Sequence, residues 1–366
     1  MPDPRVTKLA QVLVQYSLNI QPGDKFRIRS TPLAEELTLA VYKEALLAGA
    51  HITVENGVPG ADEIFFKYAS DEQLAFVSPV LKMMVETFQA ELYIEANHNT
   101  RELAGVDPAR MALSRKANAD LMKTFMERAA QKELKWSLTV FPTHAMAQEA
   151  DMSLTEYQEF VYGAGLLNED DPVAAWQKIG REQDRYIHWL KGKDQVAITG
   201  ENVDLKFSIK GRNFENCCGK ENFPDGEIFT GPVEESVNGY VRFSYPGIFS
   251  GQEIEDIELW FEDGKVVKEQ ASKGQDLLTE MLNTDTGARF LGEWGIGTNY
   301  GIQRFTKNML FDEKMGGTIH LAVGAGYPET GSKNESGLHW DMLCDMKDSE
   351  VTIDGEVFYK NGKFVV

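Results

Sequence analysis

Cysteine, long apolar runs and positive charge are all scarce in this sequence of 366 residues. Its three cysteines, Cys217, Cys218 and Cys344, are too few for a disulfide framework, and they predict reduced thiols and a cytoplasmic location. No apolar run approaches the ~20 residues that a membrane-spanning helix needs. The first residues carry charges on a helical pattern and show no signal-peptide core, so a cytoplasmic protein without a membrane partner is expected.

The deficit of basic residues argues against another class of partner. There are 37 lysines and arginines against 57 aspartates and glutamates, which gives a formal net charge of −20. Such a field repels phosphate backbones, so no nucleic-acid partner is expected. The same field attracts divalent cations and substrates that carry a free amine.

Several common catalytic motifs are missing as well. We find no G-x-S-x-G nucleophile elbow, no H-E-x-x-H helix and no G-x-x-x-x-G-K phosphate loop. The segment Gly324-Ala325-Gly326 is a weak match to a glycine-rich phosphate loop, and it is more typical of a turn.

The first half of the chain alternates between strands and helices. Strands are predicted at residues 25–29, 51–55, 90–95 and 134–141. Helices are predicted at residues 3–16, 33–48, 61–68, 70–89 and 107–131, and two more begin at the capping box of Ser153 and Glu156 and at Asp171-Pro172. This rhythm predicts an α/β domain with a largely parallel sheet, which we assign to residues 1–193.

The residue pattern changes near Asp194, where signals of strands and hairpin turns replace helical periodicity. Asp263-Gly264 and Asn361-Gly362 each stand between two strand-like segments and predict tight hairpins. One helix is expected around residues 274–282. Residues 194–366 are therefore predicted to form a mixed, mostly antiparallel α+β domain, and the whole chain an α/β protein.

The stretch from Gly287 to Asp345 is the richest in chemically useful side chains, and its glycines allow sharp turns. Its acidic and imidazole side chains are Glu293, Asp312, Glu313, His320, His339, Asp341 and Asp345. Carboxylates and imidazoles gathered in one region predict a divalent-metal site, and hence a metal-dependent hydrolase.

Two histidines carry most of this argument. If His339-Trp340-Asp341 lies on a strand, the period of two sends His339 and Asp341 to one face, where both can bind one ion. The alternative is a polar strand face with Trp340 in the core. His320 falls in a strand-like segment at residues 317–323, where a core histidine with satisfied hydrogen bonds is the alternative to a ligand.

Two glutamates stand among apolar residues and glycines. Glu293 lies in the segment LGEWG, and Glu227 lies in the segment PDGEIFTGP. A charged group in such surroundings needs a counter-charge, which a metal ion supplies. For each, an acid in a turn remains the alternative.

Five motifs of the second domain occur in the order GEIFTGP, LGEWGIG, LFDEK, GTIHLAVGAGYPETG and SGLHWDM. Together they resemble the aminopeptidase T / aminopeptidase S family of metallopeptidases. The resemblance covers most of the chain, although it is diffuse in the first domain. It implies a homodimeric exopeptidase that acts on peptides with a free N-terminus and uses two divalent ions. A donor set rich in carboxylates and poor in histidines suits Zn, Co or Mn.

The resemblance also implies roles for particular residues. The metal ligands it implies are Glu227, Glu293, Glu313, His320, His339 and Asp341. It implies in addition that Tyr327 points into the site, where it is suited to donate a hydrogen bond to the oxyanion. The expected carrier of the proton to the leaving amine is a carboxylate that binds no metal, or else Glu227 or Glu293 through a spare oxygen.

Two other interpretations stay open. His320, His339 and Asp341 alone fit the two-histidine, one-carboxylate pattern of non-haem Fe(II) enzymes, so a ring-cleaving dioxygenase is the first alternative. A small-molecule or metal-binding protein without enzymatic activity is the second. Metal stoichiometry separates them, because two ions per chain favour the peptidase, one iron favours the dioxygenase and none favours the binding protein.

Overall fold

The computed structural model describes residues 3–249 and 251–366, and the chain forms two compact units. The first comprises the chain up to Val173 together with Gly219–Pro224, and the second comprises Ala174–Cys218 with Asp225–Val366. Most of the long helix α10 (Pro172–Leu190) therefore belongs to the second unit. The α/β fold class predicted from the sequence is confirmed, with a parallel sheet in the first unit and antiparallel sheets in the second.

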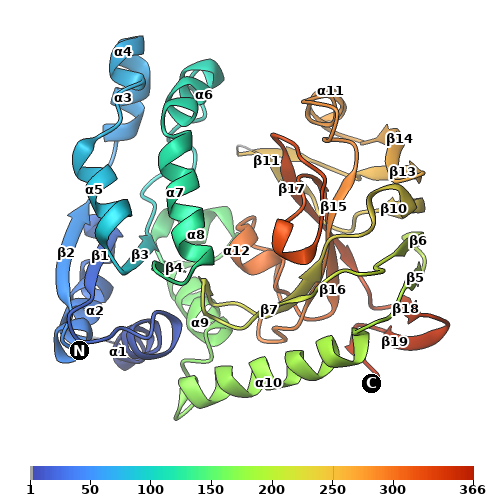
Figure 1. Cartoon of the computed structure of the whole chain (residues 1–366), viewed down its shortest axis with the longest axis horizontal. Coiled ribbons are helices and arrows are strands. Elements are labelled where there is room, and N and C mark those ends of the chain that lie inside the picture. The colour runs from blue at the N-terminus through green and yellow to red at the C-terminus, as the bar shows by residue number, and fades with distance from the viewer. Residues whose placement is uncertain (1–2, 250) are drawn as a thin grey trace. The chain divides into compact units, whose positions relative to one another are not determined.

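The first unit is built on a five-stranded sheet whose strands all pair in parallel (Figure 1). In spatial order the strands are β2 (His51–Asn56), β1 (Lys25–Ser30), β3 (Ala90–Glu95), β4 (Lys135–Val140) and β8 (Asn222–Phe223). Parallel neighbours need crossover connections, and helices supply them. Before β1 lie α1 (Pro4–Gln11) and a π-helical turn at Val12–Ser17. The helices that follow β1 in this unit are α2 (Glu35–Leu47), α3 (Ala61–Tyr68), α4 (Asp71–Leu74), α5 (Pro79–Thr87), α6 (Pro108–Ala117), α7 (Ala119–Ala130), α8 (His144–Glu149) and α9 (Leu154–Ala164), with a 3₁₀ turn at Pro32–Ala34.

Two helices expected to be continuous are each divided in the structure, so the sequence prediction was wrong there. The expected helix at residues 70–89 is split into α4 and α5, because Pro79 disfavours a helical conformation at Ser78, which instead caps α5. The expected helix at residues 107–131 is split into α6 and α7 at Asn118, whose side chain donates to the Ser114 carbonyl. The capping box of Ser153 and Glu156 is confirmed at the start of α9.

The second unit contains an eight-stranded and a five-stranded sheet, both antiparallel, and a two-stranded ribbon. The eight-stranded sheet has the order β14 (Lys265–Gln270), β13 (Glu258–Glu262), β10 (Asn238–Arg242), β6 (Val203–Ser208), β5 (Gln195–Thr199), β18 (Glu350–Ile353), β19 (Glu356–Lys360) and β20 (Lys363–Phe364). The five-stranded sheet has the order β17 (His339–Asp345), β16 (Thr318–Gly324), β15 (Leu291–Gly297), β9 (Glu227–Thr230) and β7 (Glu215–Cys217). The ribbon pairs β11 (Gly247–Phe249) with β12 (Gln252–Ile254), and three helices complete the unit: α10, α11 (Gln275–Leu282) and α12 (Met309–Asp312), with 3₁₀ turns at Glu234–Ser236 and Pro328–Thr330.

The two predicted hairpins are confirmed. Asp263-Gly264 joins β13 to β14, and Asn361-Gly362 joins β19 to β20. All four residues have positive φ, between 47° and 83°, as tight turns between twisted antiparallel strands require. The helix expected around residues 274–282 is confirmed as α11.

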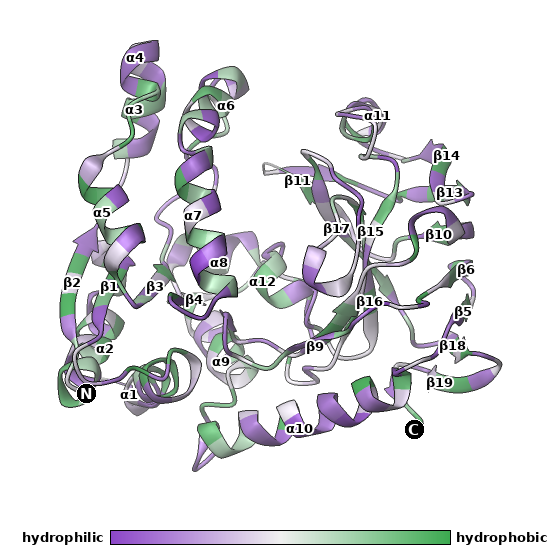
Figure 2. Ribbon diagram, in the orientation of Figure 1, coloured by the Kyte–Doolittle hydropathy of each residue, from purple (hydrophilic) through white to green (hydrophobic). Residues whose placement is uncertain are grey.

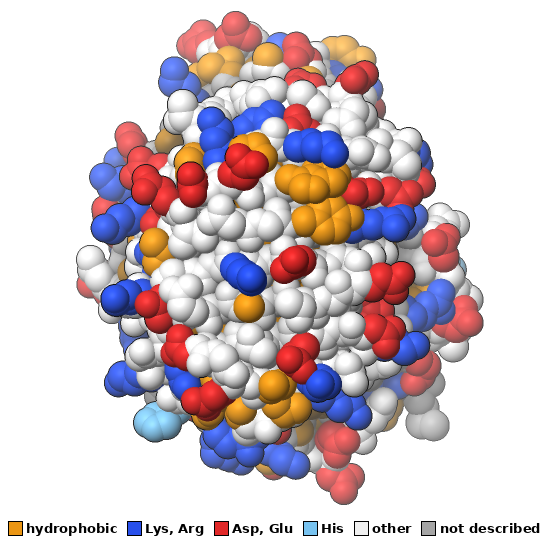
Figure 3. All heavy atoms as spheres, turned by 90° about the vertical axis from the view of Figure 1, so that its right-hand side faces the viewer, with side chains coloured by type: hydrophobic (Ala, Val, Ile, Leu, Met, Phe, Trp, Pro, Cys, Tyr) orange, Lys and Arg blue, Asp and Glu red, His pale blue; other side chains and the backbone are white. Residues whose placement is uncertain are grey.

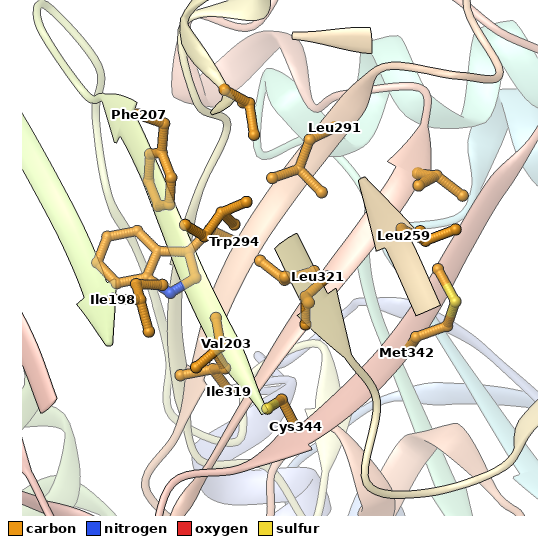
Figure 4. Packing of buried hydrophobic residues seen from close by; sticks show 14 of the residues in the cluster. Ile198, Val203, Phe207, Leu259, Leu291, Trp294, Ile319, Leu321, Met342 and Cys344 are labelled. Carbon is orange, nitrogen blue, oxygen red and sulfur yellow. The ribbon is translucent and has the colours of Figure 1, made fainter. Parts of the chain in front are cut away.

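A buried apolar layer fills the space between the two large sheets (Figure 4). Ile198, Val203 and Leu259 come from the eight-stranded sheet, and Trp294 and Leu321 come from the five-stranded sheet. Each of these five side chains is almost fully buried. Because side chains alternate along a strand, the opposite face of the five-stranded sheet carries a different set of residues.

The surface is polar and mixed in charge. On the face shown in Figure 3, acidic and basic side chains are interspersed, with scattered hydrophobic side chains between them. Helix α10 carries both hydrophobic and hydrophilic residues (Figure 2). Among the described residues, no helix is both long and apolar enough to cross a membrane.

Candidate metal centre

Three adjacent strands of the five-stranded sheet, β15, β16 and the edge strand β17, present carboxylates and imidazoles on the face opposite to the core. On β15 Glu293 alternates with the core residue Trp294, and on β17 His339 and Asp341 flank the core residue Trp340. His320 lies between core residues on β16 in the same way. The predicted alternation around His339-Trp340-Asp341 is confirmed, because Trp340 is buried in the core.

The strand register brings these side chains together. Ala322 on β16 pairs with Glu293 on β15 and with Asp341 on β17, so a small residue stands between the two acids. In the same way Gly295 pairs with His320 and Gly324 pairs with His339. Small partners opposite each ligand leave room for the larger side chains above the sheet.

Glu293 stands at the middle of the cluster. Its Oε1 atom lies 3.0 Å from His320 Nε2, and its Oε2 atom lies 3.5 Å from His339 Nε2. A second carboxylate approaches each of these nitrogens. Glu227 Oε2 lies 3.3 Å from His320 Nε2, and Asp341 Oδ2 lies 3.4 Å from His339 Nε2.

Two groups of three potential metal ligands follow from these contacts, and they share Glu293. The first comprises Glu227, Glu293 and His320, and the second comprises Glu293, His339 and Asp341. Within each group the donor atoms lie within 4.8 Å of one another. The first group is buried, and the second is partly open to solvent.

Both imidazoles are held by the backbone so that Nε2 faces the carboxylates. His320 Nδ1 lies 3.1 Å from the Glu313 carbonyl oxygen, and His339 Nδ1 lies 2.8 Å from the Ala325 carbonyl oxygen. A carbonyl oxygen has no hydrogen to donate, so each Nδ1 carries the hydrogen and donates it. This arrangement is typical of metal-bound histidines, whose second nitrogen is held by such a contact.

The donor set fits divalent ions. Glu227 Oε2 and Asp341 Oδ1 are buried and have no hydrogen-bond partner among the described residues, which is costly unless a cation binds there. Three carboxylates with two imidazoles suit Zn, Co or Mn. Glu227, Glu293, His320, His339 and Asp341 are therefore the residues that could hold two ions.

In the metal-free chain, the close carboxylates set the pKa values of the imidazoles. Burial acts to lower the pKa of His320, but Glu227 and Glu293 outweigh it and raise that pKa to about 10. Burial likewise acts to lower the pKa of His339, and Asp341 outweighs it, so the pKa is about 10. Burial raises the pKa of Glu293 itself. In the metal-free chain, protons on the two imidazoles thus balance the negative charge of the carboxylates, and a metal ion that binds must displace these protons.

We expect the metal-free protein to lose stability as the pH rises from about 6.5 to about 10. His320 and His339 have pKa values of about 6.5 when unfolded and about 10 when folded. Their stabilising contribution is therefore complete below the lower value and is lost as the pH rises through the higher one. Thermal unfolding of chelator-treated protein should show a fall in melting temperature on the order of 10 °C. Protein loaded with Mn²⁺ should not show this fall, and equal falls in both samples would contradict the assignment.

Two further residues expected at the site lie beside the two ligand groups. The Glu313 carboxylate contacts Lys314 rather than joining either group, and its backbone carbonyl orients His320. The ring of Tyr327 packs edge-on against His339, with centroids 5.0 Å apart. Asp312, named as an acid of this stretch, is instead structural, because it accepts hydrogen bonds from the Thr306 backbone and hydroxyl. Burial raises the pKa of Asp312 to about 7.

Sequence reasoning missed two features of the centre. Lys314 is 1% exposed, and its ammonium lies 2.5 Å from Glu227 Oε1. Burial acts to lower the pKa of Lys314, but the carboxylates of Glu227 and Glu313 outweigh it and hold that pKa well above its usual range. The sequence signal for Lys314 was its place directly after Glu313 in the LFDEK motif.

The second feature that sequence reasoning missed is the need for glycine at position 295. A Cβ atom there would lie 2.0 Å from the His320 ring.

Comparisons with known proteins agree with this centre. The chain matches the family described as thermophilic metalloprotease (M29) over residues 3–364. Aminopeptidase 2 of Geobacillus stearothermophilus is 28% identical, over 98% of this chain and 97% of the relative. Aminopeptidase T of Thermus thermophilus is 27% identical, over 97% and 95%. The solved structure of wild-type AmpT from Thermus thermophilus has the same fold, with a TM-score of 0.86, 24% identity and 99% of each chain covered.

The chain shares its fold with that solved structure, and one face of its five-stranded sheet carries carboxylates and imidazoles that could hold divalent ions. The chain belongs to the thermophilic metalloprotease (M29) family. The resemblance drawn from its five motifs is confirmed, and so is the enzyme class, a metallo-aminopeptidase.

Proposed function

We propose that the protein removes N-terminal residues from peptides with the help of two divalent ions, one held by each ligand group. The observation that carries this proposal is the position of Glu293, whose two oxygens face two different histidines. A carboxylate in that position is suited to bridge a pair of ions. Family membership and the two glutamates argue against the dioxygenase and the binding protein considered above.

When bound, such ions lower the pKa of a water molecule from about 15.7 towards ~7 and polarise the scissile carbonyl. The protein's own residues must then move the proton. Both oxygens of Glu293 face histidines, and Glu227 has one oxygen on Lys314 and one beside His320. We therefore propose Glu313 as the proton carrier in place of Glu227 or Glu293.

Exposure supports the choice of Glu313. Its side chain is 17% exposed, whereas those of Glu227 and Glu293 are 5% and 6% exposed. Burial raises the pKa of Glu313 to about 8 in the metal-free chain, although Lys314 acts to lower it. A carboxyl that titrates near neutral pH is well matched to taking a proton from water and passing it to the leaving amine.

Tyr327 is proposed to stabilise the oxyanion. Burial raises the pKa of Tyr327 above its usual value, and the neighbouring carboxylates act in the same direction. Its hydroxyl therefore keeps its proton and can donate to a developing negative charge. Packing between His339 and Phe229 fixes the ring.

Removing the metal tests the proposed function directly. Dialysis against a chelator should abolish release of the N-terminal residue from aminoacyl chromogenic substrates, and Co²⁺, Mn²⁺ or Zn²⁺ should restore it. Atomic emission should then give two ions per chain. Full activity in metal-free protein, or equal cleavage of substrates with a blocked N-terminus, would contradict the proposal.

We also propose a cytoplasmic homodimer. Three free cysteines without a disulfide among the described residues suit a reducing compartment. Helices α3, α5 and α7 expose large apolar side chains, and such surfaces commonly mark interfaces. These side chains are Ile64, Phe65, Tyr68, Val80, Met83, Met122 and Met126.

Light scattering at micromolar concentration should give the mass of a dimer. Replacing Tyr68, which is 80% exposed, by aspartate should shift the mass towards the monomer if this surface forms the interface. Replacing the exposed Glu262 of β13 by glutamine is the control, and it should leave the dimer intact. A monomer mass for the unmodified protein would contradict the proposal.

A further inference from the structure

Lys314 places a buried positive charge among the acids of the centre. It follows α12, and its side chain is 1% exposed. The ammonium lies 2.5 Å from Glu227 Oε1 and 3.8 Å from Asp225 Oδ1, and it contacts the Glu313 carboxylate. A buried ammonium without such partners would be very costly, so these carboxylates are what hold it in place.

A third group of potential ligands surrounds the same ammonium. Cys217, Asp225 and Glu227 offer donor atoms that lie within 4.8 Å of one another. This group shares Glu227 with the first metal group, just as the first metal group shares Glu293 with the second. The three groups therefore form a row, and the charge of Lys314 interacts with every member of the third.

We propose that Lys314 is a built-in third cation of the metal centre, which fills the position at Cys217, Asp225 and Glu227 and so keeps a third ion out. The proposal rests on the proposed function, because it takes the other two groups as metal sites. It makes Lys314 a positioning residue, which acts on the reaction through Glu227 and Glu313.

The contact with Lys314 has a direct consequence for Glu227. Because Oε1 accepts from the ammonium, Oε2 is the better placed oxygen for a metal ion, and it is the buried oxygen without a hydrogen-bond partner among the described residues. Lys314 thus holds Oε1 and leaves Oε2 to face His320.

The charges of the centre also balance. The carboxylates that line the row are Asp225, Glu227, Glu293, Glu313 and Asp341. Their five negative charges when ionised equal those of two divalent ions and one ammonium. A third divalent ion in place of Lys314 would add one more positive charge, and this charge is balanced only if Cys217 gives up its thiol proton.

Cobalt tests this inference in the unmodified protein. Titration with Co²⁺ should give two ions per chain by atomic emission, without the near-ultraviolet absorption of a thiolate bound to cobalt. Uptake of a third ion, or that absorption band, would overturn the proposal. If the unmodified protein binds no Co²⁺ and has no aminopeptidase activity, the proposed function has failed first, so the two failures are distinguishable.

Variants then test whether Lys314 is what excludes the ion. K314A should bind three Co²⁺ ions and gain the thiolate–cobalt band, whereas the double variant K314A/C217S should lose the band. K314R keeps the charge and should show two ions and no band. A purely structural ion pair predicts lower thermal stability in K314A without a new cobalt spectrum. Folded K314A that still binds two ions without the band would therefore overturn the inference.

Discussion

Glu293→Gln is expected to remove the one ligand that both metal groups share. Glutamine keeps the shape of the side chain, but it lacks the negative charge and has one oxygen in place of two. Metal content should fall below two ions per chain, and kcat/KM should fall by more than ~100-fold, since even residues that only support a ligand account for ~10–100-fold. Atomic emission and an aminoacyl chromogenic assay measure the two effects on the same sample.

Two matched substitutions make this result specific. Glu313→Gln should retain both ions and lower kcat, because Glu313 lies outside both ligand groups and is proposed to move the proton. Glu262→Gln makes the same chemical change on the exposed side of β13 and should leave metal content and kcat unchanged. Two ions and near-normal activity in Glu293→Gln would show that the centre is wrongly assigned.

Gly295→Ala is expected to be almost as damaging, although glycine has no side chain that could bind metal. The Cβ atom of an alanine there would lie 2.0 Å from both Cε1 and Nε2 of His320, far inside any real contact. Neither side can yield cheaply, because the imidazole is fully buried and Nδ1 is held by the Glu313 carbonyl. His320 should be displaced from Glu227 and Glu293, so metal affinity and kcat/KM should both fall by more than ~100-fold.

A matched glycine separates this effect from a general loss of fold. At Gly163 on α9, a new Cβ atom meets nothing within 4 Å, so Gly163→Ala should leave metal binding intact. Overpacking at Gly295 should lower the free energy of unfolding by about 1–3 kcal/mol, which leaves a folded protein to assay. If Gly295→Ala binds two ions normally, the His320 ring does not lie against Gly295.

The same strands hold the ligands and the core. On β15, β16 and β17 the core residues Trp294, Leu321 and Trp340 alternate with the residues of the centre. Packing between the sheets therefore fixes the strand positions to which the ligands are attached. A ligand change should thus act mainly on metal binding, whereas a core change should act mainly on stability.

The sequence by itself determined the local structure of the centre. Period-two alternation at His339-Trp340-Asp341 predicted which two side chains share a face, and the core position of Trp340 bears this out. Dipeptides such as Asp263-Gly264 predicted the hairpins, because few residues accept positive φ in such turns. Both signals depend only on neighbours in the chain, so they can be read without knowledge of the fold. Continuity of helices was harder to predict, as the break at Asn118 shows.

Only the tertiary structure decided how distant residues meet. Glu227 reaches His320 because β9 pairs with β15 and β15 pairs with β16, and no local pattern specifies those pairings. The role of Gly295 follows from the residue opposite it in the register, which the sequence does not show. Lys314 looks like an ordinary surface lysine in the chain, yet folding buries it against Glu227, where the carboxylate and the ammonium balance each other's charge.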